Sequence, residues 1–464
     1  MSEVYFHNYE LQDGVDYFLY IGELKNYGLN LFLKEALIKA TGRPWDFIAV
    51  VPDIFEQYNY DNVIAINPRA KEMFLTYGCN VSCRLSASKF MRAVSSSPHV
   101  GSLAKELVAR QGELFIYMYE SLPDMSLTDI PGVQILGPPS EVAWRLNNKV
   151  TQYGLFRDKV PLVDHHVCQG MDDLTQTTDR LWSKWSDGIF VTCEYSAAGI
   201  NSVVARSEAD IRKKFGDYEA TYLITRYMPH EYDPTVLGVV ANEKDVYVAG
   251  VADQNIADQT RFVGSTYPSV LPEDTIARLT EYTRIVGREM AKQGYRGIFG
   301  CDYLVDPGGR ILFLEVNARK QGTTLEFCCT LERTLPPGSP LLPELEYYAV
   351  TENRFPPNTV EPSARPDHIH WGTFNFKLVG EVHTGGYIPQ STHERDAFQR
   401  VATGKLKKEF LILEHIGNDF VVASGSFLGR IVALGQDRVG VAQGLEQGRK
   451  MLALTIDDQL PSVR

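Results

Sequence analysis

The sequence lacks the long apolar runs and the cysteine pairs that mark two large classes of protein. No apolar run approaches the roughly 20 residues of a membrane-spanning helix, and the N-terminus lacks a basic start followed by an apolar stretch. The seven cysteines are odd in number and scattered, without the paired CxxC motifs of a zinc site. We therefore expect a cytoplasmic protein whose cysteines are reduced and mostly buried.

Positive charge is also scarce. Lys and Arg number 46 against 58 Asp and Glu, a formal net charge of -12, which argues against a partner such as nucleic acid or an anionic membrane. The common nucleotide and hydrolase motifs GxxxxGK[ST], GxGxxG after a strand and GxSxG are missing. A phosphate-bearing small molecule is compatible with this composition, because a local site on an acidic protein can be cationic or hold a metal ion.

Changes of pattern divide the 464 residues into three expected domains and one connection. Residues 1–139 alternate short apolar runs with amphipathic segments, which predicts an α/β domain. Residues 140–335 carry short strands, largely paired as hairpins with helices between them, which predicts an α+β domain. Eight prolines lie in 336–366 and predict an extended connection. Residues 367–464 predict a small C-terminal α+β domain.

Hydrophobic periodicity places the main elements within these domains. We expect one helix on which Leu29, Leu33 and Leu37 share a face, and another that is capped by Ser102 and runs to Gln111. Further helices are expected at 174–185, 276–294 and 442–454, and strands at 47–51, 114–119, 189–192, 221–228, 235–241 and 246–253.

The most informative stretch reads as two strands, 297–305 and 311–319, around a turn. If Asp306 pairs with Ile311 across a four-residue loop, Asp302 lies opposite Glu315. Side chains alternate along a strand, so one face should carry Gly300, Asp302, Glu315, Asn317 and Arg319. The other should be an apolar core face of Phe299, Cys301, Tyr303, Val305, Leu312, Leu314 and Val316.

Two carboxylates across a hairpin repel each other unless a cation neutralises them. Carboxylate and amide oxygens are hard ligands that suit Mg²⁺ or Mn²⁺ rather than zinc. We therefore predict Asp302, Glu315 and Asn317 as metal ligands. The alternative is a solvated face with acids placed by chance, and Asn317 and Arg319, in step on the same face, argue against it.

Asp302, followed thirteen residues later by Glu315-Val-Asn317-Ala-Arg319, resembles the metal-binding signature of the ATP-grasp superfamily. The resemblance covers about residues 140 to 330 and implies an ATP-grasp fold whose two lobes grip ATP. In those enzymes the matching Asp and Glu hold one Mg²⁺, the Glu and Asn hold a second, and both metals bridge ATP phosphates.

The resemblance also implies phosphate contacts upstream. Lys149, on a helix leading to Gly154, is similar to the family's first nucleotide lysine, which contacts the ATP phosphates. The loop 196–202, beginning with Ser196, keeps the small residues that let backbone N–H groups approach phosphate. Many members carry a second phosphate lysine on the preceding strand, where this chain departs from the pattern with Thr192.

Arg226, Tyr227 and Met228 lie in a segment similar to the link between the two lobes, where backbone groups read the adenine edge. Glu231 or Asp233 is then placed for the ribose hydroxyls. Taken alone, each such residue is more often plain surface or core. Their order and separation ahead of the hairpin give them weight.

A second departure concerns the oxyanion that develops during the reaction. Some relatives place an Arg two residues before the metal Asp, where this chain has Gly300. Arg319, Arg261 and Arg296 are the alternatives for that role. Arg261 lies where relatives bind the activated carboxylate and can clamp a carboxylate through two hydrogen bonds; the alternative is an ordinary surface arginine.

The family usually activates a carboxylate as an acyl phosphate, releases ADP and lets a nucleophile attack, so no protein nucleophile is required. Three domains in this order are most similar to amino-acid or peptide ligases of specialised metabolism, such as the pheganomycin-type peptide ligases with a pre-ATP-grasp N-terminal domain. We expect small-molecule carboxylate and amine substrates and leave the oligomeric state open. The alternatives are transfer to a thiol, a hydroxyl or bicarbonate, and a nucleotide-binding module that has lost catalysis, as the departures at Thr192 and Gly300 suggest.

Overall fold

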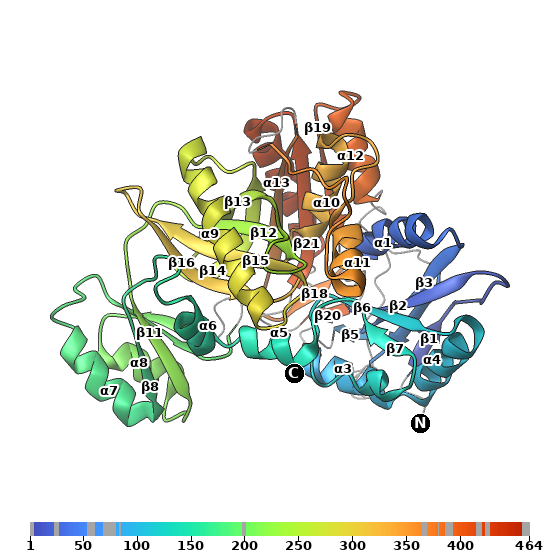
Figure 1. The fold of residues 1–464 in the computed structure, drawn as a ribbon. Coiled ribbons are helices and arrows are strands. Elements are labelled where there is room, and N and C mark those ends of the chain that lie inside the picture. The colour runs from blue at the N-terminus through green and yellow to red at the C-terminus, as the bar shows by residue number, and fades with distance from the viewer. Residues whose placement is uncertain are drawn as a thin grey trace.

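The structure is a computed structural model. It describes residues 4–22, 27–52, 61–67, 80–82, 85–196, 201–363, 369–378, 380–385, 393–413, 420–422 and 427–456. The described strands form sheets of six, four, eight and three strands, with helices packed against them (Figure 1). The predicted mixed α/β character is confirmed.

The N-terminal sheet has the order β1-β4-β3-β2-β6-β7, and only the β1–β4 pair is antiparallel. Its strands are β1 (Val4–His7), β2 (Asp16–Ile21), β3 (Trp45–Val51), β4 (Val63–Ile66), β6 (Leu114–Met118) and β7 (Val133–Ile135). The helices α1 (Tyr27–Thr41), α3 (Ala87–Ser96) and α4 (Pro98–Gln111) and the 3₁₀ turn η2 (Ser126–Asp129) belong to the same part. Leu29, Leu33 and Leu37 are buried on one face of α1, as predicted.

The predicted cap at Ser102 is wrong. Helix α4 begins at Pro98, and its N-cap is Ser97, whose side chain accepts a hydrogen bond from the backbone N–H of Val100. Proline fits the first helical position because its fixed φ suits a helix and its missing N–H has no partner to lose there. The N-cap therefore lies five residues earlier than the sequence predicted.

A four-stranded antiparallel sheet of order β10-β9-β11-β8 forms the small lobe at the left of Figure 1. Its elements are β8 (His165–Gln169), α7 (Gly170–Leu181), β9 (Ile189–Cys193), β10 (Ser202–Ala205), α8 (Glu208–Phe215) and β11 (Thr221–Arg226). Leu174, Leu181 and Trp185 are buried together in the core of this lobe. The helix ends at Leu181, and Trp185 follows in the turn.

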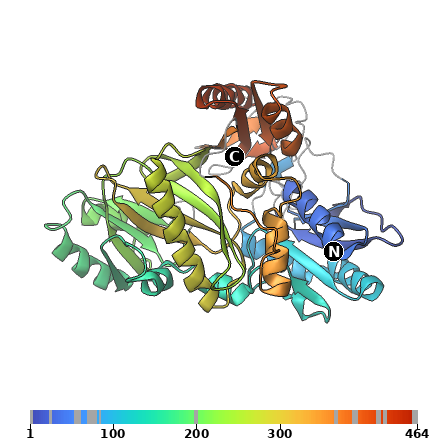
Figure 2. The ribbon, with the colours of Figure 1, turned by 45° about the horizontal axis from the view of Figure 1, so that its top comes forward.

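The largest sheet has the order β16-β15-β12-β13-β14-β17-β21-β19 and curves through the centre of the molecule (Figure 2). Its strands are β12 (Pro234–Val240), β13 (Val246–Ala257), β14 (Arg261–Tyr267), β15 (Gly297–Val305), β16 (Ile311–Asn317), β17 (His370–Lys377), β19 (Lys408–Leu413) and β21 (Phe427–Gly435). The helices beside it are α9 (Glu273–Lys292) and α13 (Arg438–Ala453).

The sheet does not end at the expected start of the C-terminal domain. Strand β14 pairs with β17, with Thr266 opposite Gly372 and Tyr267 opposite Trp371. A three-stranded sheet joins β18 (Val382–Thr384) and β20 (Phe420–Val422) to the N-terminal strand β5 (Asn80–Ser82). The C-terminal strands thus extend sheets begun by earlier parts of the chain, and the predicted domain boundaries remain predictions.

The stretch 336–366, predicted as an extended connection, contains a helix, α11 (Leu342–Glu352). Pro343 lies in its first turn, where proline is tolerated. Leu342 and Leu345 are fully buried in the same apolar cluster as Leu29 and Leu33 of α1. Proline content therefore marked a helix start here rather than a continuous linker.

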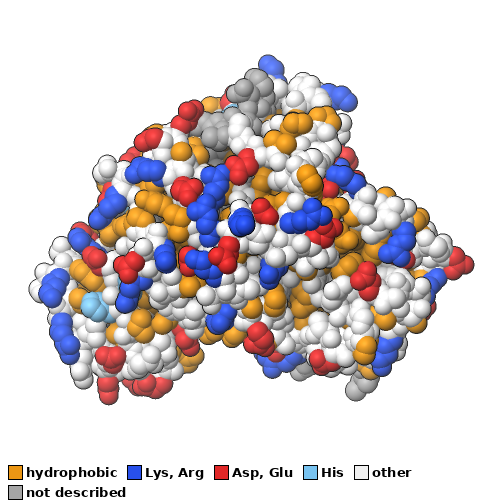
Figure 3. Space-filling model, in the orientation of Figure 1, with side chains coloured by type: hydrophobic (Ala, Val, Ile, Leu, Met, Phe, Trp, Pro, Cys, Tyr) orange, Lys and Arg blue, Asp and Glu red, His pale blue; other side chains and the backbone are white. Residues whose placement is uncertain are grey.

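The remaining helices are α5 (Ser140–Leu146), α6 (Lys149–Phe156), α10 (Thr324–Thr334) and α12 (Glu394–Ala402). None of the helices in the described part of the chain combines the length and the apolar character needed to cross a membrane. Basic and acidic side chains are interspersed over the face drawn in Figure 3.

Candidate active site

The predicted hairpin of β15 and β16 is present, with one change of register. Asp302 lies opposite Glu315 and Gly300 opposite Asn317, as predicted. Val305, rather than Asp306, pairs with Ile311, and the register shifts between Asp302 and Tyr303. A bulge thus accommodates one extra residue on β16. The prediction of a four-residue loop between Asp306 and Ile311 is wrong.

This bulge changes which side chains share the face of Asp302. Phe313 pairs with Tyr303 and is fully buried in the core. Leu312, opposite Leu304, and Leu314 belong instead to a small apolar cluster with Leu304, Val163 and Met228. The assignment of Leu312 and Leu314 to the core face is therefore wrong, since strict alternation holds only without a bulge. The face of the hairpin that carries Asp302 and Glu315 therefore also carries apolar side chains next to these acids.

Lys149 reaches the hairpin from the start of α6 and forms an ion pair with Glu315. Asn148 caps this helix through the backbone N–H of Thr151 and also donates a hydrogen bond to Glu194 of the small lobe, at 2.8 Å. Burial lowers the pKa of Lys149 to about 8, while nearby Asp302 acts in the opposite direction. The helix start thus fixes a buried ammonium group beside the two acids.

Asn317 and Arg319 continue the same face. Asn317 donates a hydrogen bond from Nδ2 to Asp302 at 2.9 Å and accepts one at Oδ1 from Arg319 at 3.0 Å. Arg319 also donates to the hydroxyl of Tyr119, which follows β6, at 2.9 Å. The structure therefore brings five predicted residues together: Lys149, Asp302, Glu315, Asn317 and Arg319.

The N-terminal part also contributes Glu120, which the sequence did not indicate. Its carboxylate accepts a hydrogen bond from Asn147 at 3.0 Å, and Asn147 in turn accepts one from the backbone N–H of Ala318 at 2.9 Å. The carboxyl end of β6 is therefore tied to the end of β16. No local signal marks this contact, because it joins residues about 170 positions apart.

The donor set fits a hard divalent cation. Asp302 and Glu315 are directly opposite, and an amide side chain lies beside them at Asn317. Burial raises the pKa of Asp302, although Thr235 and Asn317 donate hydrogen bonds that act against this shift. Such a carboxylate is favoured as an anion by a nearby cation. Within the described ranges no three or more His, Cys, Asp or Glu side chains gather into a group that could hold a metal ion, so the predicted site rests on two acids and one amide.

Thr192 has a structural role in the small lobe. Its hydroxyl donates a hydrogen bond to Ser196 at 3.0 Å and lies 3.3 Å from the carbonyl of Asn201. It therefore closes the base of the predicted phosphate loop, of which residues 197–200 lie outside the described part. The phosphate contact predicted for Ser196 stays a prediction.

The link between the lobes follows β11. Arg226 and Tyr227 donate backbone hydrogen bonds to Asp164 and Gly188, and Met228 belongs to the apolar cluster beside the hairpin. The backbone N–H of Glu231 bonds to Val305 on β15 at 3.1 Å. This segment thus lies against the hairpin, and the adenine contacts predicted for Arg226, Tyr227 and Met228 stay predictions.

The two candidate ribose acids have partners within the protein. Glu231 accepts a hydrogen bond from the hydroxyl of Tyr232 at 3.0 Å, and Asp233 lies 2.9 Å from Nε2 of His230. The hydrogen bond from His230 to Asp233 raises the pKa of His230. Ribose binding by Glu231 or Asp233 remains a prediction.

In the described structure the side chains of Arg261 and Arg296 form their hydrogen bonds away from the predicted metal ligands. Arg261 begins β14 and pairs with Asp258 at 2.8 Å. Arg296 donates to Asn353 at 2.6 Å, at the end of α11. Of the three arginines considered for the oxyanion, Arg319 is the one that contacts a predicted metal ligand, and the carboxylate role of Arg261 stays a prediction.

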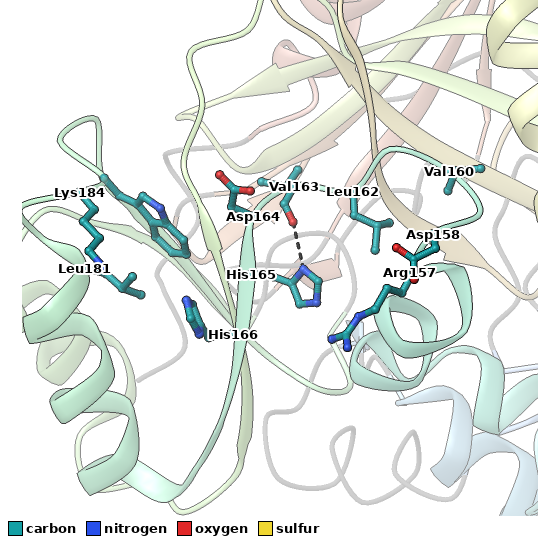
Figure 4. A pocket seen from close by; sticks show the side chains of 11 residues that line it. Arg157, Asp158, Val160, Leu162, Val163, Asp164, His165, His166, Leu181 and Lys184 are labelled. Carbon is teal, nitrogen blue, oxygen red and sulfur yellow. Dashed lines mark hydrogen bonds between the residues drawn. The ribbon is translucent and has the colours of Figure 1, made fainter.

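A cavity of about 640 Å³ opens beside β8 (Figure 4). His165 and His166 line it, with Arg157 and Lys184 at its sides. His165 contacts the carbonyl of Val163 at 3.1 Å, and His166 lies against the ring of Trp185. Both histidines are thus held by contacts within the protein.

Gln321 is a site residue that sequence reasoning missed. Its buried amide donates from Nε2 to Thr235 at 3.0 Å and lies 3.4 Å from Asp302. It also fills the space above Gly300. Two features of the sequence could have indicated Gln321: it lies two residues after Arg319, and position 300 on the same face is a glycine, which leaves space for another side chain.

No protein-family model matches the chain. Over 196 residues, 41% of this chain, it is 22% identical to the butirosin acyl-carrier protein L-glutamate ligase of Niallia circulans. The matched region spans 46% of that relative's length.

Solved structures with a similar fold cover nearly the whole chain. The biotin carboxylase of Campylobacter jejuni, in a beta-gamma-ATP complex, has a TM-score of 0.61 and 14% identity and covers 95% of this chain and 91% of that chain. An ADP complex of N5-carboxyaminoimidazole ribonucleotide synthetase has a TM-score of 0.57 and 12% identity, with 96% and 97% covered. These proteins are ATP-grasp enzymes. This chain has the ATP-grasp fold, as the signature in its hairpin predicted.

Proposed function

We propose that the protein is an ATP- and Mg²⁺-dependent ligase that activates a carboxylate as an acyl phosphate and couples it to an amine. The observation that carries this proposal is the convergence of Lys149, Asp302, Glu315, Asn317 and Arg319 at one end of the hairpin. Two acids and an amide suit a hard cation, and two positive side chains lie beside them.

The apolar cluster next to these charged residues is evidence for a binding site for the nucleotide base. Leu304, Leu312 and Met228 pack together on the site side of the hairpin, and the link between the lobes lies against β15. An adenine ring buried there would put its triphosphate toward the acids and Lys149. The protein thus offers apolar and charged regions in the order in which ATP carries its base and its phosphates.

The protein promotes this reaction mainly by neutralising the negative charge of the phosphate groups. The metal, when bound, neutralises phosphate oxygens, and Lys149 and Arg319 bring further positive charge to the transferring phosphoryl group. A carboxylate oxygen of the substrate attacks the γ-phosphorus, the bond to the bridging oxygen breaks, and ADP leaves. The amine nitrogen attacks the acyl carbon, phosphate leaves with the bonding electron pair, and the nitrogen releases its proton to solvent.

The substrate class is an amino acid or small peptide, in the biosynthesis of a specialised metabolite. The support is the curated relative, whose name states that it acts on L-glutamate and an acyl-carrier protein. The N-terminal part takes part in the site through Tyr119 and Glu120, so selectivity is shared between it and the ATP-grasp lobes.

The test combines nucleotide and product analysis. With ATP, Mg²⁺ and panels of amino acids and small peptides, the protein should release ADP and form a product lighter by one water than its summed reactants. Release of AMP, or of ADP without an amide, would contradict the proposal. Mass spectrometry of the product also identifies donor and acceptor together.

A second candidate function keeps the activation step and changes the acceptor to a thiol, a hydroxyl or bicarbonate. The carrier protein in the relative's name favours a thiol within this group. A thioester product, which hydroxylamine cleaves rapidly, would favour it over the amide.

A module that has lost catalysis predicts instead that Glu315→Gln behaves like the parent in every assay, so a large drop in ADP release on that change would exclude it.

A further inference from the structure

Gly300 and Gln321 occupy one space in the site. A Cβ atom built on Gly300 would lie 2.1 Å from both Cδ and Nε2 of Gln321. Side-chain carbons do not approach this closely, so Gln321 can hold its position only while residue 300 is glycine. The two residues therefore form a matched pair across the end of the hairpin.

The backbone fixes Gln321 in this place. Its N–H donates to the hydroxyl of Thr324 at 2.9 Å, and that hydroxyl donates back to the carbonyl of Gln321 at 2.8 Å, at the start of α10. The neighbouring Lys320 is held by a backbone bond to Tyr119 and an ion pair to Glu346. The side chain of Gln321 thus projects over Gly300 from a rigid support.

The amide of Gln321 faces a predicted metal ligand. Nε2 donates to Thr235 at 3.0 Å and lies 3.4 Å from Oδ1 of Asp302, while Asn317 donates to Oδ2 at 2.9 Å. Thr235 is directly opposite Asp302 on β12. The carboxylate of Asp302 thus has an amide beside each of its two oxygens, and Gln321 is also joined to Thr235 on the neighbouring strand.

We propose that Gln321 is a positioning residue that holds Asp302 in its metal-binding orientation, and that glycine at position 300 is required to admit it. The inference rests on the proposed function, since it assigns a cation to Asp302. Partners that orient metal ligands typically change metal affinity about 10- to 100-fold when they are removed. The pair also gives the departure at Gly300 a physical reason.

The test measures binding of Mn²⁺ in the presence of ADP by electron paramagnetic resonance of the free ion, which requires no turnover. Gln321→Leu keeps most of the volume and removes the amide, so we expect it to weaken Mn²⁺ binding about 10-fold or more at an unchanged melting temperature. Gly300→Ala should have a similar effect, because the new Cβ displaces the amide.

The double variant decides the mechanism. If Gly300→Ala acts only by displacing Gln321, it should cause no further loss in a Gln321→Ala background. Gly101→Ala in α4, where a new Cβ meets nothing within 4 Å, is the matched control and should bind Mn²⁺ like the parent. Equal Mn²⁺ affinity of parent and Gln321→Leu, or additive losses in the double variant, would overturn the inference alone. Failure of the parent itself to bind Mn²⁺ would overturn the proposed function as well.

Discussion

Lys149 of α6 and Glu315 of β16 form an ion pair in which only 11% of the lysine side chain and 28% of the glutamate side chain are exposed. The lysine precedes the small lobe in the chain, and the glutamate follows it. The pair therefore links a residue before the small lobe to a residue after it and places opposite charges side by side at the site.

The first prediction concerns Lys149. Lys149→Met keeps much of the buried volume and removes the positive charge that we propose faces the ATP phosphates, so we expect a loss in kcat of about 100-fold or more. ADP release at saturating ATP measures it. Lys159→Met, on the loop after α6, is the control. Activity within about threefold of the parent would remove Lys149 from the phosphate site.

The second prediction concerns Arg261. If it clamps the substrate carboxylate, Arg261→Ala should raise the KM for the carboxylate about 10-fold or more, since a bidentate charged contact is lost, and leave the KM for ATP unchanged. Steady-state kinetics with each substrate varied separates the two constants. Arg212→Ala, a surface variant on α8 of the small lobe, is the control. Unchanged constants would show that Arg261 serves only its pair with Asp258.

The third prediction concerns the pair of Lys320 and Glu346, whose side chains are 3% and 0% exposed. Glu346→Leu leaves a buried ammonium group without a partner, so we expect a loss of about 3–5 kcal/mol in the free energy of unfolding. Adding Lys320→Met should recover most of it, because the uncompensated charge is gone. Denaturant unfolding measures both. The exposed pair of Arg354 and Glu352 is the control, at about 1 kcal/mol or less.

The fourth prediction concerns pH and His230. Its hydrogen bond to Asp233 raises its pKa above the ordinary value of 6.5, so the folded state binds the proton more tightly than the unfolded state. The pair therefore contributes stability below the unfolded pKa and loses it as pH rises through the folded pKa. His230→Gln should lower the melting temperature more at about pH 5.5 than at about pH 8.5. An equal decrease at both values would contradict the assignment.

Strand alternation and one short motif predicted most of the residues that meet at the candidate site. Alternation along a strand brought Asn317 and Arg319 to the face of Glu315. The predicted pairing of Asp302 with Glu315 is correct because the bulge offsets the one-residue error in the predicted turn. The resemblance then supplied Lys149, which the structure joins to Glu315. These relations span few residues or repeat a known pattern, so the sequence carries them.

Other features depend on contacts between distant segments. The bulge that moves Leu312 and Leu314 to the site face follows from packing on both sides of the hairpin. The helix at 342–352 follows from its burial against α1. The two-residue alternation of a strand carries no information on the bulge, and the number of prolines carries none on the helix.

The amino-acid sequence by itself indicated the ATP-grasp fold and the acids that suit a divalent cation, because both rest on residue type and short spacing. Only the tertiary structure decided that Tyr119 meets Arg319 and that Gln321 fills the space above Gly300. Those contacts arise where the N-terminal sheet, the hairpin and α10 pack together, and close packing is set by the whole fold rather than by any one segment.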